Sequence, residues 1–414
     1  MNAKALVIVV LPDEIKILES DVAGRPARDY LLESLGKCDE AEVKVAVDGN
    51  TLPPVWFEKY QNISGCRLTE FHAANQADSG LLLIDARAWL SHTALANIFL
   101  RTRHAINCFR IVESSAIIHT TRREAMTLAV YFPPRQVRSN LFKRGRTSTQ
   151  QGLEQILDSE ALANAIVVDS AHLDASKPAL LIGSYEDIAE LERCLLLERA
   201  NLAMRQGVRI RDPNKVYIRG ELVCGSDVEI EINVIIEGHV VLGNGVKIGA
   251  NSILRSSRIG EHTCINPFSL VEQSSIGSDS FVGPYGRIRP GSVIGDGVQI
   301  GNYVDIKNSQ VGAGSRINHH TFIGDAVLAG QVTIGAGTIT CNHDGTGTNQ
   351  TIIERGAYIG SGCNLVAPLR IGEGAIVGAG STITRDVPAG KLTLARAPQT
   401  TIENWRGPKT GREK

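Results

Sequence analysis

The sequence lacks the features that mark secreted and membrane-spanning proteins. Its eight cysteines are scattered over 414 residues without a CxxC pair, which is typical of free thiols in a reducing compartment. No apolar run approaches the roughly 20 residues needed to span a membrane. The apolar run at 5–10 has no positive cluster before it and is soon followed by Asp13 and Glu14, so we expect a buried strand there rather than a signal peptide. These absences predict a cytoplasmic protein without membrane insertion.

An excess of charge of one sign is also missing. The chain has 43 Lys and Arg against 44 Asp and Glu, a formal net charge of −1 at pH 7. Proteins that coat nucleic acid or anionic membranes depend on a basic excess, so neither is expected as a partner. Glycine, in contrast, is abundant at 41 residues, and much of it falls within one region.

That region, from residue 216 to residue 385, repeats a short motif. An aliphatic residue, usually followed by glycine, returns about every sixth position, as at Ile248-Gly249, Ile294-Gly295 and Ile359-Gly360. A period of six belongs neither to a helix nor to a simple strand and is typical of a parallel β-helix. Each short strand would turn one aliphatic side chain into a common core, and the chain would bend at the small residue that follows. We therefore predict a β-helix over 214–390, followed by a polar, basic tail at 391–414.

Residues 1–213 predict a separate domain. Apolar runs at 6–10, 43–47 and 81–84 are expected strands, and 26–35 is an expected helix. Strands that alternate with helices favour an α/β domain with a doubly wound sheet. A connecting helix is expected from Tyr185 to Gln206. Its predicted apolar face carries four residues, namely Ile188, Leu191, Leu195 and Leu202.

Two polar segments interrupt these patterns. The segment 135–151 is basic and rich in Ser and Thr, which fits either a solvated loop or an anion-binding loop. The repeats break between 340 and 352, where the chain is polar and loop-forming. Loops that leave a rigid solenoid commonly carry binding residues.

The repeat region is similar to the C-terminal half of the bifunctional bacterial enzymes of UDP-N-acetylglucosamine synthesis. In that family an N-terminal uridyltransferase is joined to a left-handed β-helix that acetylates glucosamine 1-phosphate from acetyl-CoA. The resemblance therefore implies a left-handed β-helix acyltransferase that serves amino-sugar and cell-wall synthesis. It is carried by the segments 287–291, 301–307, 314–325, 334–342, 365–368, 379–381 and 395–399.

The resemblance implies that His319 is the catalytic base. Acetyl transfer to an amine needs a base for the amine proton, and an imidazole titrates near the working pH. Asp305, where the family typically has Glu, is the expected carboxylate that fixes the tautomer of this histidine. No Cys or Ser lies in a nucleophile motif, so we expect direct attack on the thioester. His320 is expected to be structural.

The substrate positions implied by the resemblance are partly altered. Arg289 and Lys307 match the two basic groups that would bind the acceptor phosphate. Phe322, Thr333 and Thr348 stand where the family has Tyr, Asn and Lys, and each lost polar contact would cost about 1–3 kcal/mol if buried. The acceptor is thus glucosamine 1-phosphate or a related amino-sugar phosphate, or the site has lost activity.

The resemblance also implies acetyl-CoA as the cosubstrate. His343 replaces a tyrosine of the family beside Asn342, which exchanges one flat ring for another. In the family the cofactor residues come from neighbouring chains, so a homotrimer is expected. The expected cofactor positions are Ala336, Asn342, His343, Ser361, Ala379 and Arg396.

The residues that the family uses for uridyl transfer are missing from the N-terminal sequence. A Gly-x-Gly-Thr-Arg loop should cradle the nucleotide phosphates with its backbone N–H groups. The segment 11–15 has instead Pro12, which lacks an N–H, and the carboxylates of Asp13 and Glu14. The expected Mg²⁺-binding aspartate aligns with Arg87, while Asp85 is out of register. We therefore expect a degenerate nucleotidyltransferase-like domain without Mg²⁺, and no metal site elsewhere.

Three alternatives stay open. The protein could retain uridyltransferase activity and be bifunctional. It could be a non-catalytic trimeric scaffold, which the substitutions in the acceptor site favour and the retained His319 disfavours. A zinc hydratase would need three converging histidines, whereas adjacent His319 and His320 point in opposite directions along a strand.

Overall fold

The computed structural model describes residues 184–405 without a gap. Before them it describes 5–10, 21–23, 25–26, 29, 32–33, 35, 41–47, 63–67, 81–85, 88–90, 92–104, 109–112, 127–132, 165–169 and 180–181. The chain divides into two compact units, Met1–Leu195 and Leu196–Lys414. This division falls within helix α6 (Tyr185–Arg205), and the sequence-based boundary at 213/214 stays a prediction.

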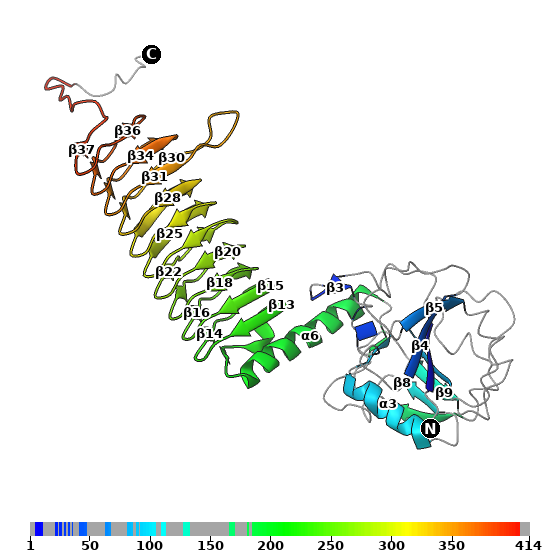
Figure 1. Ribbon diagram of the computed structural model, residues 1–414. Coiled ribbons are helices and arrows are strands. Elements are labelled where there is room, and N and C mark those ends of the chain that lie inside the picture. The colour runs from blue at the N-terminus through cyan, green and yellow to red at the C-terminus, as the bar shows by residue number, and fades with distance from the viewer. Residues whose placement is uncertain are drawn as a thin grey trace, which may run out of the picture. The chain divides into compact units, whose positions relative to one another are not determined.

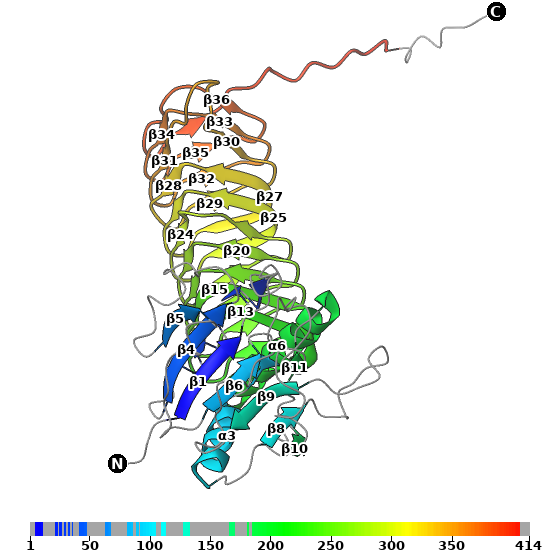
Figure 2. The same ribbon diagram turned by 90° about the vertical axis from the view of Figure 1, so that its right-hand side faces the viewer.

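The first unit is built on a seven-stranded sheet, which confirms the predicted α/β class (Figure 2). Strand β9 runs antiparallel to both neighbours, and the other pairs are parallel. Helix α3 (His92–His104) and two short strand pairs, β2 (Asp21–Val22) with β3 (Arg25–Pro26) and β7 (Ala88–Trp89) with β11 (Leu180–Leu181), accompany it. The strand order is β10 (Ile166–Asp169), β8 (Phe109–Val112), β9 (Thr127–Phe132), β6 (Leu81–Asp85), β1 (Ala5–Val10), β4 (Ala41–Val47) and β5 (Ile63–Arg67).

The predicted strands of this unit are confirmed as β1, β4 and β6. Every residue of β6 is buried, as expected for a continuous apolar run inside a largely parallel sheet. Of the predicted helix at 26–35, Asp29, Leu32, Glu33 and Leu35 are helical, but Pro26 belongs to strand β3. The segments 11–15 and 135–151 and residue Arg87 lie outside the described residues.

The connecting helix α6 is confirmed, with one correction to its apolar face. Ile188, Leu191 and Leu195 are buried, but Leu202 is 49% exposed. The last turns use a different face, because Ala200 and Ala203 pack into the core of the second unit. Arg199 Nη1 donates to the Ile218 carbonyl at 2.7 Å and fixes the helix against the first coil. In the part of the chain that the structure describes, no helix has the length and apolar character needed to cross a membrane.

The second unit is a left-handed parallel β-helix of short stacked strands, as predicted (Figure 1). Its inward aliphatic residues stack in register, so that Ile288, Ile306 and Ile323 follow one another and are fully buried. The aliphatic residues that recur about every six positions are therefore the core residues of the β-helix. The strands are β12 (Arg209–Ile210), β13 (Val216–Cys224), β14 (Glu229–Ile230), β15 (Val234–Leu242), β16 (Lys247–Ile248), β17 (Ile253–Arg255), β18 (Arg258–Ile259), β19 (Cys264–Ile265), β20 (Leu270–Glu272), β21 (Ser275–Ile276), β22 (Phe281–Val282), β23 (Arg287–Ile288), β24 (Val293–Ile294), β25 (Gln299–Lys307), β26 (Gln310–Val311), β27 (Arg316–Gly324), β28 (Ala326–Leu328), β29 (Thr333–Ile334), β30 (Ile339–Cys341), β31 (Thr351–Ile353), β32 (Tyr358–Ile359), β33 (Asn364–Val366), β34 (Leu369–Ile371), β35 (Ile376–Val377), β36 (Thr382–Ile383) and β37 (Leu392–Thr393).

One corner of the coils positions the candidate site, and we call it the histidine corner. In β25 and β27 the chain turns there at Tyr303 (φ 55°) and His320 (φ 45°), both in the left-handed region. Residues before the turn, such as His319, lie on one face of the β-helix. Residues after it, such as Phe322, lie on the next face.

Candidate functional site

His319 hydrogen-bonds to a side chain of the preceding coil. It pairs in register with Asn302 across β25 and β27, and its Nδ1 lies 2.6 Å from Asn302 Oδ1. An amide oxygen only accepts hydrogen bonds, so this contact fits the neutral tautomer with its proton on Nδ1, which leaves Nε2 with a free lone pair. The imidazole is exposed, and a substrate can therefore reach it.

Within one chain, the side chain that contacts His319 Nδ1 is Asn302, whereas Asp305 is the residue expected to fix the tautomer. It pairs in register with Phe322, on the face beyond the histidine corner. Its Oδ2 lies 3.8 Å from Arg289 Nη1. The turn at Tyr303 explains the difference, because it sends Asn302 and Asp305 to opposite sides of the corner.

Arg289, Asp305 and Lys307 share the face beyond the corner. Arg287 and Ile288 pair with Asp305 and Ile306, which places Arg289 next to Lys307 in successive coils. Burial raises the pKa of the Asp305 carboxyl, against the opposing effect of the positive charges of Arg289, Arg287 and Lys307. Asp305 Oδ1 is buried without a hydrogen-bond partner within one chain.

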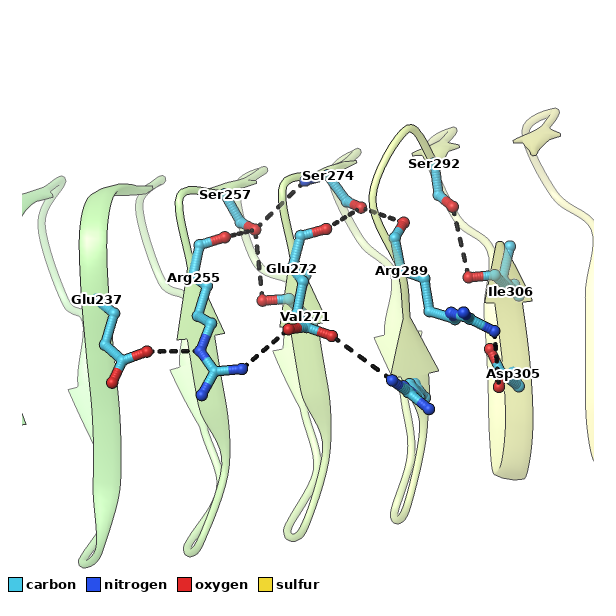
Figure 3. A network of polar contacts seen from close by, with 11 residues as sticks. Glu237, Arg255, Ser257, Val271, Glu272, Ser274, Arg289, Ser292, Asp305 and Ile306 are labelled. Atoms are coloured by element: carbon cyan, nitrogen blue, oxygen red, sulfur yellow. Dashed lines mark hydrogen bonds and ion pairs between the residues drawn. The ribbon is translucent and has the colours of Figure 1, made fainter. Parts of the chain in front are cut away.

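A chain of alternating charges leads along this face toward Asp305 (Figure 3). Arg255 contacts Glu237 at 2.5 Å and Glu272 at 2.9 Å, and Glu272 lies 4.0 Å from Arg287. Among residues 184–405, Lys307 forms no such salt bridge, although its charge acts on Asp305 and Asp325. Lys307 therefore offers its ammonium group to an anion, and Arg289 adds a second cation beside it.

Phe322 and Asn342 lie close to Lys307. Gly324, the register partner of Lys307, is so close to both side chains that a Cβ built on it would lie 2.6 Å from the Phe322 ring and 2.9 Å from Asn342 Nδ2. Asn342 Nδ2 donates to Asp325 Oδ2 at 2.5 Å. Burial of Asp325 acts to raise its pKa, but the hydrogen bonds from Asn308 and Asn342 and the charge of Lys307 outweigh it and lower the pKa.

The loop 342–350 projects from the coils (Figure 1) and is held together by Asp344. Asp344 Oδ1 accepts hydrogen bonds from the backbone N–H groups of Thr346 and Gly347, both at 2.9 Å. These bonds hold the pKa of the Asp344 carboxyl well below its usual range. His343 and Thr348 face each other across the loop in an antiparallel bridge, and His343 Nδ1 accepts from the Gly345 N–H at 3.0 Å.

Thr333 lies apart from the basic residues. It pairs with Arg316 and Tyr358, on the face before the histidine corner. Within one chain, the structure therefore does not bring Thr333 to Arg289 and Lys307.

Most of the expected cofactor positions form one line that starts at His319. The register on both sides of the corner places Ala336, Ser361 and Ala379 successively above this histidine. At the far end, Arg396 Nη1 donates to the Ala379 carbonyl at 3.0 Å. Asn342 and His343 lie elsewhere, at the base of the projecting loop, and one chain does not bring them to this line.

Sequence reasoning missed two features of the site. The first is Asn302, whose only signal was its place one coil before His319. The second is a glycine directly after each of the three small residues of the line. These glycines are Gly337, Gly362 and Gly380. A Cβ built on these glycines meets no atom closer than 3.7 Å, so the strip beside the line is open.

Comparisons with known proteins agree with this architecture. A family model described as the GMPPB C-terminal domain matches residues 215–311, and a model described as bacterial transferase hexapeptide (six repeats) matches residues 350–385. Bifunctional protein GlmU of Aromatoleum aromaticum is 42% identical over 303 residues, which cover 72% of this chain and 66% of that protein. Bifunctional protein GlmU of Azoarcus sp. is 43% identical, with 72% and 67% covered. The chain belongs to the GlmU family.

The chain spans about two thirds of the length of these GlmU relatives. Its first unit also has a weak similarity to a solved structure, 4-diphosphocytidyl-2C-methyl-D-erythritol synthase from Anaerococcus prevotii. That similarity has a TM-score of 0.34 and 14% identity, and it covers 47% of this chain and 96% of that one. Membership in the GlmU family thus rests on the sequence relatives, and it accounts for both the α/β unit and the hexapeptide β-helix.

Proposed function

We propose that the protein is an acetyl-CoA-dependent N-acetyltransferase that acts on glucosamine 1-phosphate or a related amino-sugar phosphate. The observation that carries this proposal is the line from His319 through Ala336, Ser361 and Ala379 to Arg396. It combines a base at one end, an open strip of backbone along its length and a guanidinium at the other end. A long thioester with a phosphorylated tail fits such a line, with its acyl group at the base and its phosphates at the arginine.

The acceptor would bind on the face beyond the histidine corner. Lys307 and Arg289 would hold its phosphate. Asp305 would position Arg289. Phe322 would contribute apolar contact.

In the proposed reaction the acceptor amine attacks the thioester carbonyl carbon. The C–N bond forms, the C–S bond breaks, and His319 Nε2 takes the proton that the amine loses. The CoA thiolate leaves and recovers a proton from the imidazolium. The member of the line next to His319 is Ala336, which has no nucleophile, and Ser361 lies one coil further from the base.

A complete site would need more than one chain. Asn342, His343 and Thr333 lie away from the line and the basic residues in a single chain, although the family resemblance assigns them to the cofactor and the acceptor. A homotrimer would bring such groups together from neighbouring copies. Sedimentation equilibrium of the full chain tests this, and a stable, active monomer would contradict it.

We infer further that the first unit has lost uridyl transfer. The segment 11–15 lacks the glycines of a phosphate cradle and carries two carboxylates, which would repel nucleotide phosphates. Formation of UDP-N-acetylglucosamine from UTP and N-acetylglucosamine 1-phosphate with added Mg²⁺ would contradict this inference and establish a bifunctional enzyme.

The experiment for the acyltransferase is release of free CoA from acetyl-CoA with a panel of phosphorylated amino sugars. A second function is favoured by the replacements Phe322, Thr333 and Thr348, which remove polar groups from the acceptor site. Acetyl-CoA binding without turnover on any acceptor would support that function, a non-catalytic trimeric scaffold.

A further inference from the structure

Asn302 and Tyr303 hold the two adjacent histidines of the next coil. Asn302 Oδ1 contacts His319 Nδ1 at 2.6 Å. The Tyr303 ring stacks on the His320 ring, with centroids 4.9 Å apart and an angle of 27° between the planes. The backbone of His319 is also fixed, because Thr321 Oγ1 donates to its carbonyl at 2.7 Å. The imidazole of His319 thus has a rigid backbone and one polar side-chain partner.

We propose that Asn302 is the positioning residue of the acetyl transfer, which orients His319 and selects its tautomer. This proposal rests on the proposed acyltransferase function. A neutral imidazole can carry its proton on either ring nitrogen, and only the form protonated on Nδ1 presents Nε2 to the acceptor. An amide oxygen at Nδ1 selects that form.

The neutrality of the amide has a second consequence. A carboxylate at Nδ1 would stabilise the charged imidazolium, whereas an amide oxygen carries no full charge. An acidic residue at position 302 would therefore favour the charged ring, whereas Asn302 gives the ring a neutral partner. In residues 184–405 the histidine that pairs with a carboxylate is His239, with Glu221 at 3.0 Å, and not His319.

The other groups near His319 do not take over this role. On its own strand His320 is engaged with the Tyr303 ring. In the coil above, Ala336 and Gly337 have no titratable group. In the coil below, Asp305 lies beyond the corner beside Arg289. Within one chain, Asn302 is therefore the side chain placed to orient the His319 ring.

The test compares Asn302→Leu and Asn302→Asp in the full chain. Asn302→Leu keeps the size of the side chain but removes the acceptor, and we expect kcat to fall about 10²-fold, within the range of general base catalysis. The KM for acetyl-CoA should stay within about twofold. Asn302→Asp restores the acceptor, so we expect kcat to recover to within about tenfold of wild type, with the acid limb of the pH–rate profile displaced to higher pH.

Asn251→Asp is the matched control for charge. Asn251 is the turn residue of this corner in an earlier coil (φ 59°), the position that Tyr303 occupies in the coil of Asn302, and its Oδ1 accepts from Asn233. This variant adds the same charge away from His319, so its pH profile should match that of wild type. A profile that moves equally in Asn251→Asp and Asn302→Asp would overturn the proposal, because the effect would then be one of net charge.

A readout that needs no turnover separates this inference from the proposed function. The ¹⁵N shifts of the His319 ring, assigned by comparison with His319→Gln, should show a proton on Nδ1 and none on Nε2 in the neutral protein. In Asn302→Leu the two tautomers should mix. A ring protonated on Nε2 in the wild type, or a kcat in Asn302→Leu within about threefold of wild type, overturns the proposal. A wild type with the expected tautomer but no acyl transfer overturns the proposed function instead.

Discussion

The guanidinium of Arg396 donates to the carbonyl oxygen of Ala379 at 3.0 Å. This contact holds the arginine at the end of the line that begins at His319. Because guanidinium groups bind phosphates as paired donors, Arg396→Ala should raise the KM for acetyl-CoA about tenfold while the KM for the acceptor stays unchanged. Steady-state kinetics with each substrate varied in turn measures both constants. Equal effects on the two KM values would show that Arg396 does not act on the cofactor.

The open strip at Gly337, Gly362 and Gly380 gives a second prediction. The same corner carries Tyr285 and Tyr303 with positive φ values in earlier coils, so Gly362→Tyr should cost about 1–2 kcal/mol of stability at most. The new side chain would fill the open strip, and the KM for acetyl-CoA should rise more than tenfold. Thermal unfolding and kinetics of the same sample separate the two effects. Unchanged cofactor kinetics in a folded variant would place acetyl-CoA elsewhere.

A third prediction concerns the phosphate of the acceptor. Lys307 forms no salt bridge among residues 184–405, and its loss should therefore not leave a partner charge unpaired. Lys307→Met should lower kcat/KM for the acceptor about 10- to 100-fold, since hydrogen bonds to charged groups contribute about 1.5–3 kcal/mol. Lys247→Met is a matched control on an earlier coil, where the lysine pairs with Glu229 at 3.6 Å. A similar loss in both variants would argue against a phosphate at Lys307.

Phe322 tests which acceptor the site prefers. The family has tyrosine at this position, and the Phe322 ring lies beside Gly324 and Asn342. If glucosamine 1-phosphate is the acceptor, Phe322→Tyr should raise kcat/KM for it by about 2- to 12-fold, the effect of one added hydrogen bond of about 0.5–1.5 kcal/mol. A decrease would indicate an acceptor with an apolar group at this position.

The loop 342–350 should respond to acid. The pKa of Asp344 is lowered by its hydrogen bonds to the backbone of Thr346 and Gly347. A depressed carboxyl pKa adds stability that is present above the unfolded value of about 3.9 and is lost as the pH falls through the folded value. The amide resonances of Thr346 and Gly347 should thus stay unchanged between pH 7 and pH 4 and shift only below that. A shift centred at or above pH 4 would contradict this contact.

The β-helix could be predicted from sequence because the aliphatic residues of the six-residue repeat are the residues of its core. Ile288, Ile306 and Ile323 each occupy one inward position, and each is fully buried. The residues that lie beside His319 in neighbouring coils could not be located by counting along the repeat. Successive coils do not all contain the same number of residues, as the pairs Phe281 with Gln299 and Gln299 with Arg316 show. Register between coils therefore had to come from the structure.

The surroundings of Asp305 show the same limit. A family motif gives the residue types around a site, but it does not say on which side of a corner each side chain lies. The left-handed turn at Tyr303 separates Asp305 from His319 and leaves Asn302 beside the ring. Leu202 in α6 shows a related limit, because a helix that changes the face it buries cannot be described by a single apolar stripe.

The most direct test of the proposed function is CoA release by the full chain from acetyl-CoA and glucosamine 1-phosphate, or another amino-sugar phosphate, beside His319→Gln. We predict acceptor-dependent turnover by the wild type and a loss of about 10²- to 10⁴-fold in kcat for the variant, the range of general base catalysis. Turnover that survives within about tenfold in His319→Gln, or no turnover with any acceptor, would contradict the proposed function.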